Sequence, residues 1–140
     1  MQKIDHIGIA VRSLAASVPV FEKLLNCKCY KTEEVRDENV NTAFFRKGET
    51  KIELLESMKE DGVITKFIET RGESIHHIAF EVENIEEEMD RLKREGFVFI
   101  YEKPKPGADN KRICFLHPKS TNGILIELCE SIRTPSKGTQ

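Results

Sequence analysis

The sequence predicts an α+β fold in which two βαβββ modules in tandem form one curved, mixed sheet around a cleft. Three observations support this prediction. The chain carries an internal duplication, each copy has short runs in which apolar and polar residues alternate, and each copy has one segment with apolar residues at helical spacing. We expect a single domain over residues 1–130, with modules at 3–57 and 74–130, a linker helix at 60–70 and a flexible tail at 131–140.

The duplication is visible near both ends of each copy. Residues 3–14, KIDHIGIAVRSL, align with residues 74–85, SIHHIAFEVENI, at an offset of 71. Farther on, KIELLE at 51–56 aligns with LIELCE at 125–130, at an offset of 74. The difference between the two offsets places three extra residues in the loops of the second copy. Two copies of one structural module are therefore implied.

The first copy begins with a strand at 4–11, where β-branched residues occur in alternation. Apolar residues from Leu14 to Leu25 then lie on one helical face. Pro19 interrupts this segment, and proline removes a helical hydrogen bond unless it stands in the first turn. We therefore expect this helix to start late or to kink at Pro19. Strand-like runs follow at 27–34, 40–46 and 50–56.

The second copy repeats this order. A strand is predicted at 75–82, and Asn84 can cap the following helix, with Glu87 three residues later as in a capping box. Gly96 is suited to end this helix, because glycine readily adopts the left-handed conformation found there. Between the copies, apolar residues at helical spacing predict the short linker helix. Three further strands are expected at 97–102, 111–116 and 123–130.

The composition is that of an ordinary globular chain and excludes several classes of partner. Of 140 residues, 39% are hydrophobic and 33% charged, and no apolar run approaches the roughly 20 residues that span a bilayer. A formal net charge of −2, without a basic stripe, argues against nucleic acid. The N-terminus lacks a secretory pattern, so we expect a cytoplasmic protein. Open sheet edges need covering, so we also expect an edge-to-edge homodimer.

Four donor side chains occupy matching places in the two copies. His6 and His77 lie on the first strand of each copy, and Glu53 and Glu127 lie on the last. If the two modules pack around a common cleft, their pseudo-two-fold symmetry brings all four side chains to one point. Two imidazoles and two carboxylates suit a divalent Co, Ni, Mn, Fe or Zn ion better than a dedicated Ca or Mg cage.

Taken singly, each of these residues has a simpler interpretation. A histidine in an apolar strand is more often a hydrogen-bonded core residue, and a glutamate on a strand usually faces solvent. The duplication favours the metal interpretation over these simpler ones, because the histidine and the glutamate recur together in both copies. A glutamate buried toward a cleft without a cation would also be unfavourable. His76 is expected on the opposite face of the sheet as a structural residue. Glu56 and Glu130, which also recur, are expected at the rim.

At these positions the chain resembles the vicinal oxygen chelate superfamily, whose fold is a pair of βαβββ modules around a divalent metal. Within it, the chain is most similar to the methylmalonyl-CoA epimerase family. The resemblance implies a glyoxalase-like fold. It rests on DHIGIAV at 5–11, GETKIELLES at 48–57, GESIHHIAFEV at 72–82 and KPKPGADNKRICFLHPKSTNGILIELCE at 103–130.

The resemblance also implies site residues and a reaction. His6, His77 and Glu127 match metal-binding positions, and Glu53 matches a position that the family fills with Gln or Glu. The implied enzyme is an isomerase that epimerises methylmalonyl-CoA, an acyl-CoA substrate, by removing the C2 proton and stabilising the resulting enolate on the metal. Glu127 and Glu53 are the candidate catalytic carboxylates, with Glu127 as one base. Thr42 stands where some members carry a glutamate proposed as the second base, so the identity of that base is open.

Two alternatives are also consistent with the residues. Lactoylglutathione lyase, or glyoxalase I, belongs to the same superfamily, has a similar His/Glu/His/Glu set and works through an enediolate. A metal-free, resistance-type protein that only binds a small molecule would use the same fold, since fold alone does not determine function. The long LHPKS segment beginning at Leu116 favours the epimerase.

Overall fold

Each copy of the duplicated segment folds into a strand, a helix and three further strands. The computed structural model describes residues 1–132. The first module consists of β1 (Lys3–Ala10), α1 (Leu14–Leu25), β2 (Lys31–Val35), β3 (Val40–Lys47) and β4 (Thr50–Ser57). The helix α2 (Val63–Arg71) links it to the second module, which consists of β5 (Ser74–Glu81), α3 (Ile85–Arg94), β6 (Lys105–Gly107), β7 (Lys111–Leu116) and β8 (Ile126–Ser131).

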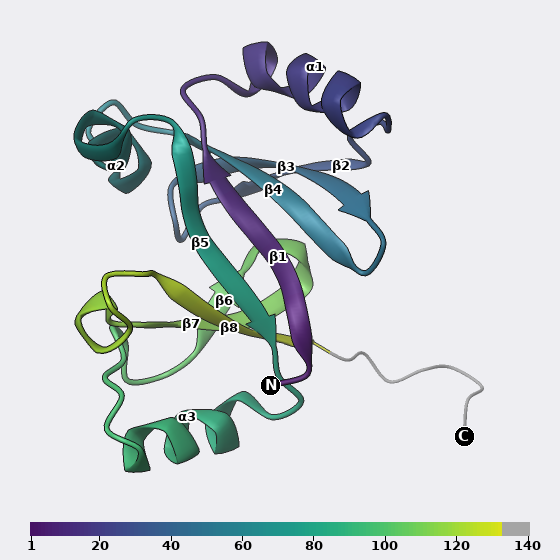
Figure 1. Cartoon of the computed structure of the whole chain (residues 1–140). Coiled ribbons are helices and arrows are strands. Elements are labelled where there is room, and N and C mark those ends of the chain that lie inside the picture. The colour runs from purple at the N-terminus through teal and green to yellow at the C-terminus, as the bar shows by residue number, and fades with distance from the viewer. Residues whose placement is uncertain (133–140) are drawn as a thin grey trace.

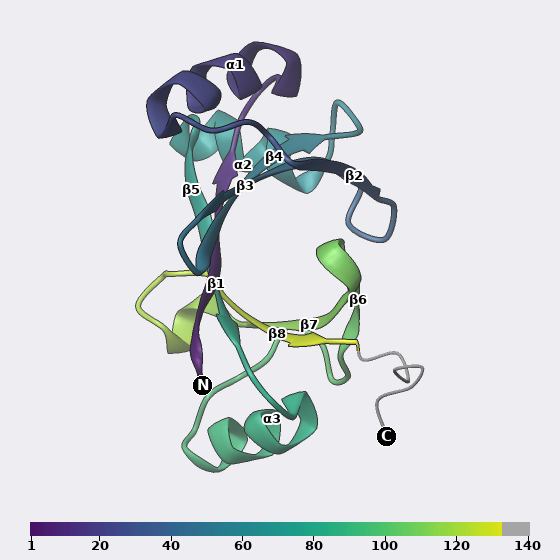
Figure 2. The ribbon, with the colours of Figure 1, turned by 90° about the vertical axis from the view of Figure 1, so that its right-hand side faces the viewer.

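The strands form one sheet in the order β2-β3-β4-β1-β5-β8-β7-β6. β1 and β5 pair antiparallel at its centre, and each pairs in parallel with the last strand of its own module. The sheet curls strongly, so that its two edge strands face each other across an opening (Figure 1 and Figure 2). This mixed, curved, nearly closed sheet with flanking helices confirms the fold class expected from the sequence.

The helices α1 and α3 pack on the outer face of the sheet, each over its own module (Figure 2). The Phe21 ring of α1 lies 6.3 Å, centroid to centroid, from the Phe45 ring of β3. In the second module, Met89 of α3 packs in one buried cluster with Cys114 and Leu128. Because these helices bury the outer face, the concave inner face remains available to line a cavity.

The two edge strands are bridged by polar contacts within one chain. Lys31 Nζ of β2 lies 2.9 Å from Asp109 Oδ1, and the Asp109 N–H donates to Glu33 Oε1 at 2.9 Å. Lys105 of β6 forms an ion pair with Glu38. These contacts hold the two ends of the sheet together within one chain.

Some expected strands differ from those observed. The strand predicted at 97–102 is wrong, since Phe99 makes only an isolated bridge to Leu116, and the strand that follows α3 in that module is β6. The N–H of Ile100 still donates to the carbonyl of Phe115, so the alternating pattern reflects a contact with β7 that is too short to form a strand. The strand predicted at 27–34 begins only at Lys31.

Of the late start and the kink expected for the first helix, the late start is wrong. α1 begins at Leu14 and continues through Pro19. The Ser13 side chain accepts a hydrogen bond from the Ala16 N–H, which caps the helix ahead of the proline. The tail expected at 131–140 falls mostly outside the described residues, and Ser131 itself ends β8.

Glu56 and Glu130, expected as rim residues, instead hold the first turns of the two helices. The Leu14 N–H donates to Glu56 Oε2 at 3.0 Å, and the Ile85 N–H donates to Glu130 Oε2 at 3.3 Å. The first N–H groups of a helix have no partner within the helix, and they carry partial positive charge. Helix anchoring therefore accounts for the recurrence of these two glutamates.

We expect Glu56→Ala to lower the free energy of unfolding by about 1 kcal/mol, because it leaves the Leu14 N–H without its charged acceptor. Urea unfolding measures this change, and metal affinity should be unaffected. Glu56→Gln keeps an acceptor oxygen and should lose less stability. An unfolding midpoint for Glu56→Ala equal to that of the parent chain would rule out the anchoring role.

Candidate metal centre

Four side chains from four strands converge on the concave face of the sheet. His6 of β1 and His77 of β5 have their Nε2 atoms 3.1 Å apart. Glu127 Oε1 of β8 lies 3.0 Å from His77 Nε2 and 3.5 Å from His6 Nε2. Glu53 Oε1 of β4 lies 3.3 Å from His6 Nε2 and 3.6 Å from His77 Nε2. The structure thus brings together all four residues that the sequence selected as ligands.

The strand pairing explains how these side chains meet. In the register of the two central strands, His6 stands opposite Ala79 and His77 stands opposite Gly8. Each imidazole therefore lies over a small residue of the neighbouring strand. A Cβ atom at Gly8 would lie 2.6 Å from Nδ1 and 2.8 Å from Nε2 of His77, distances at which the ring would have to move.

We expect Gly8→Ala to weaken metal binding roughly 10–100-fold, the range typical of changes that disturb the orientation of a metal ligand. The backbone of Gly8 needs no special conformation, so the far-ultraviolet circular dichroism spectrum should not change. Competition with a chromophoric chelator measures the dissociation constant for Zn²⁺. A Gly8→Ala protein that binds Zn²⁺ as tightly as the parent would show that the His77 ring has another place to go.

The four donors line a cavity of about 380 Å³. They are themselves buried, with between 3% and 6% of their surface exposed. Much of the remaining wall is apolar and comes from both modules, so a bound molecule would be held away from bulk water. The apolar lining includes Val35, Leu55, Ile64, Phe115 and Leu125.

The buried carboxylates favour a positive charge at this point. Burial lowers the pKa of His6, but the carboxylates of Glu53 and Glu127 outweigh it and raise that pKa well above its ordinary value. Burial also raises the pKa of Glu127, yet the adjacent imidazoles dominate and lower it to about 2. A divalent cation would supply this positive charge without protons on the imidazoles.

The spacing of the donors fits a single ion. Two nitrogen ligands about 2.1 Å from one ion and at right angles to each other lie about 3.0 Å apart. The His6 and His77 Nε2 atoms are 3.1 Å apart, and together with a Glu127 oxygen they fall within 4.8 Å of one another. This donor set of two imidazoles and two carboxylates suits Co, Ni, Mn, Fe or Zn.

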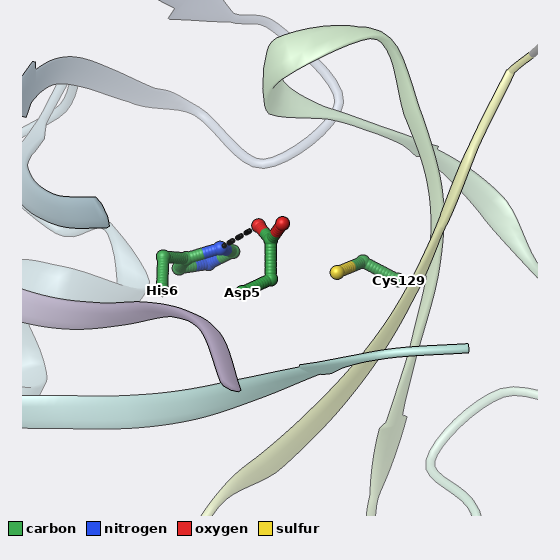
Figure 3. Close-up of side chains that lie close together, drawn as sticks. All are labelled: Asp5, His6 and Cys129. Atoms are coloured by element: carbon green, nitrogen blue, oxygen red, sulfur yellow. Dashed lines mark hydrogen bonds and ion pairs between the residues drawn. The ribbon is translucent and has the colours of Figure 1, made fainter. Parts of the chain in front are cut away.

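Asp5 lies beside His6, with its carboxylate next to the imidazole ring (Figure 3). Its Oδ2 atom is 2.8 Å from His6 Nδ1, the ring nitrogen that faces away from the other donors. Lys51 Nζ and Lys111 Nζ lie 3.4 Å and 3.5 Å from Asp5 Oδ1. Burial raises the pKa of Asp5, but the hydrogen bond to His6 and the two lysines lower it far below its usual range. Asp5 is therefore a carboxylate that accepts from His6.

Cys129 completes a second group of potential donors with Asp5 and His6 (Figure 3). Both oxygens of Asp5 are already engaged, one by His6 and the other by the two lysines. Burial raises the pKa of the Cys129 thiol, and its Sγ lies 3.5 Å from the carbonyl oxygen of Phe80, to which it donates. Because both Asp5 oxygens and the thiol hydrogen already have other partners, we assign no ion to this group.

The expectation that His76 points to the opposite face of the sheet is wrong. Its Nδ1 atom lies 2.9 Å from His77 Nδ1, and it lines the same cavity. The cause is an irregularity in the sheet, because Gly8 pairs with His77 but Ile9 pairs with Ile75. One residue of β5 is thus left over, and strict alternation cannot be assumed there. Burial and the neighbouring His77 lower the pKa of His76 to about 3, so its imidazole is neutral.

Thr42 lies in the cavity wall with 1% of its surface exposed. Its Oγ1 donates to the backbone carbonyl of Glu33 at 3.0 Å. The hydroxyl is therefore committed to the backbone of β2 and supplies no carboxylate at this point of the cavity.

Within residues 1–132, no helix is both long and apolar enough to cross a membrane. A model of the Glyoxalase/Bleomycin resistance protein/Dioxygenase superfamily matches residues 5–115. The chain belongs to this superfamily.

Within this superfamily, the chain is similar to several methylmalonyl-CoA epimerases. It is 38% identical to the ethylmalonyl-CoA/methylmalonyl-CoA epimerase of Cereibacter sphaeroides over 128 residues, which is 90% of this chain and 96% of that protein. The crystal structure of methylmalonyl-CoA epimerase from Mycobacterium tuberculosis superposes with a TM-score of 0.89 at 32% identity, covering 94% of this chain and 89% of that one. A variant of the Streptomyces coelicolor methylmalonyl-CoA epimerase, in complex with 2-nitronate-propionyl-CoA, gives a TM-score of 0.88 at 31% identity, with 95% and 99% covered.

Proposed function

We propose that this chain is a methylmalonyl-CoA epimerase, an isomerase that uses one divalent ion to invert the configuration at C2 of its acyl-CoA substrate. The observation that carries this proposal is the convergence of His6, Glu53, His77 and Glu127 in one buried cavity. The similarity to epimerases over about nine-tenths of the chain supports the choice of substrate.

The substrate chemistry requires a base and a way to stabilise negative charge. The C2 hydrogen of methylmalonyl-CoA lies between a thioester and a carboxylate, and its removal builds charge on the thioester oxygen. A divalent ion held by the four donors would act as a Lewis acid at that oxygen. Glu127 then removes the C2 proton. A glutamate is ordinarily ionised at neutral pH, and this carboxylate becomes more basic when it moves away from the neighbouring positive charge.

Inversion also requires a proton donor on the opposite face of the planar enolate. Glu53 comes from the other module, at the place that corresponds to Glu127. Thr42 is poorly suited to this role, since its hydroxyl already donates to the Glu33 carbonyl. Glu53 is the remaining carboxylate of the cluster, and the identity of the second proton donor stays open.

Incubation with methylmalonyl-CoA in D₂O tests the proposal, with the hemithioacetal of methylglyoxal and glutathione as the control substrate. We expect one deuterium at C2, racemisation of the substrate, and no turnover of the hemithioacetal. Turnover of the hemithioacetal alone would identify a glyoxalase. Binding without turnover of either compound would identify a non-catalytic binding protein.

The proposal includes a homodimer. It is supported by aliphatic residues exposed on the two central strands, where Ile4 is 39% and Ile75 59% exposed. Sedimentation equilibrium tests the assembly, and a solution mass of a single chain, 16.1 kDa, would contradict it. The cytoplasmic location expected from the sequence stays a prediction.

A further inference from the structure

The two central strands carry matching irregularities beside the metal-centre histidines. In β1, Ile4 pairs with Phe80 but His6 pairs with Ala79, so Asp5 is an extra residue. The irregularity of β5 leaves His76 as the extra residue in the same way. An extra residue disrupts strict alternation and re-aims nearby side chains. Both irregularities therefore bring the residue before a ligand histidine to the ligand's own side of the sheet.

Asp5 and His76 are equivalent positions of the duplicated module, because both immediately precede the ligand histidine of their copy. Their contacts are equivalent as well. Asp5 Oδ2 lies 2.8 Å from His6 Nδ1, and His76 Nδ1 lies 2.9 Å from His77 Nδ1. In each case the contact is made to the ring nitrogen that faces away from the cluster. The two Nε2 atoms are left free to face each other at 3.1 Å.

The partner of one ring nitrogen determines which nitrogen carries the proton. A carboxylate such as Asp5 can only accept, so His6 carries its proton on Nδ1. Two neutral imidazoles that meet through Nδ1 atoms need one donor and one acceptor. If His77 is the donor, its Nε2 lone pair is available to an ion, and His76 carries its own proton on Nε2. The T-shaped packing of the His76 ring against Phe67, with centroids 4.8 Å apart, holds that ring in place.

We propose that Asp5 and His76 are paired positioning residues, which fix the Nδ1–H tautomers of His6 and His77 and so present both Nε2 atoms to the metal. This inference rests on the metal centre of the proposed function. The two positioning residues differ in chemistry. The carboxylate of Asp5 makes the His6 imidazole a stronger metal ligand than the neutral ring of His76 makes the His77 imidazole. His77 is consequently the weaker of the two nitrogen ligands.

Zinc binding and histidine tautomers test this inference without any measurement of turnover. In the Zn²⁺-loaded protein with ¹⁵N-labelled histidine, long-range ¹H–¹⁵N correlation spectra should show both ligand rings protonated at Nδ1. His76→Ala should weaken Zn²⁺ binding roughly 10–100-fold and speed the solvent exchange of the His77 Nδ1 proton. His76→Asp copies the carboxylate of the first module and should restore affinity to at least that of the parent chain. His117→Asn, at an exposed histidine outside the cavity, should leave affinity unchanged.

Three results would overturn the inference. These are a His77 ring bound through Nδ1, an unchanged Zn²⁺ dissociation constant in His76→Ala, or a loss in His76→Ala that His76→Asp fails to restore. Failure of the parent chain to bind Zn²⁺ would contradict both this inference and the proposed metal centre. A protein that gives the expected zinc affinities and tautomers but does not epimerise methylmalonyl-CoA would contradict the proposed function alone.

Discussion

Glu127→Gln should slow proton transfer at C2 of methylmalonyl-CoA by about 10²–10⁴-fold, whereas Glu53→Gln should keep much of the turnover. General acid–base catalysis typically contributes a factor of that size, and the substitution removes the carboxylate assigned as the base. Glutamine retains a neutral oxygen that can still face the ion, so metal content should fall only modestly in both variants. The pseudo-symmetry of the two glutamates makes this comparison a matched pair.

Deuterium incorporation from solvent, measured at equal metal loading, separates the roles of these two residues. Equal rates in Glu127→Gln and Glu53→Gln would show that Glu127 is merely a ligand and that the base lies elsewhere. A larger loss in Glu53→Gln would reverse the assignment of the two carboxylates.

His6→Ala should remove most of the metal affinity, a loss larger than the roughly 10–100-fold expected from changes to residues that only support a ligand. It should also remove the stabilisation that the metal gives to the folded chain. That stabilisation is about 2.7 kcal/mol when the free metal concentration is 100 times the dissociation constant. The reason is that the His6 nitrogen is 3.1–3.5 Å from all three other donors.

His117→Asn is the matched control for this experiment. His117 is exposed, and its Nδ1 accepts from the Lys119 N–H at the start of a short 3₁₀ helix, a role that asparagine can also fill. Thermal unfolding with and without Zn²⁺ should give the same metal-dependent shift in His117→Asn as in the parent. A full shift in His6→Ala would exclude His6 as a ligand.

Much of the fold and the main cluster could be predicted because the duplication constrains both. Once the two strand segments that carry His6 and His77 are aligned, the symmetric places of these histidines follow from the sequence, and so do those of Glu53 and Glu127. The structure brings these four side chains together, while their roles as metal ligands and bases stay predictions.

Local irregularities of strand pairing could not be predicted from the sequence. Alternation places His76 on the wrong face because it assumes a regular ladder, whereas the extra residue in β5 is determined by how β1 and β5 pair. The segment around Phe99 alternates like a strand but makes only one bridge. Glu56 and Glu130 recur as regularly as the ligands do, so recurrence alone could not separate helix anchoring from chemistry.

Metal-dependent proton transfer at C2 in this cavity is tested most directly by removing the metal and adding it back. Deuterium incorporation into methylmalonyl-CoA in D₂O should therefore be compared between the protein stripped of metal by a chelator and the same protein after addition of Co²⁺, Ni²⁺, Mn²⁺, Fe²⁺ or Zn²⁺. We expect exchange to be lost on stripping and to return with at least one of these ions at one ion per chain. Exchange at an undiminished rate in the stripped protein would contradict this metal dependence.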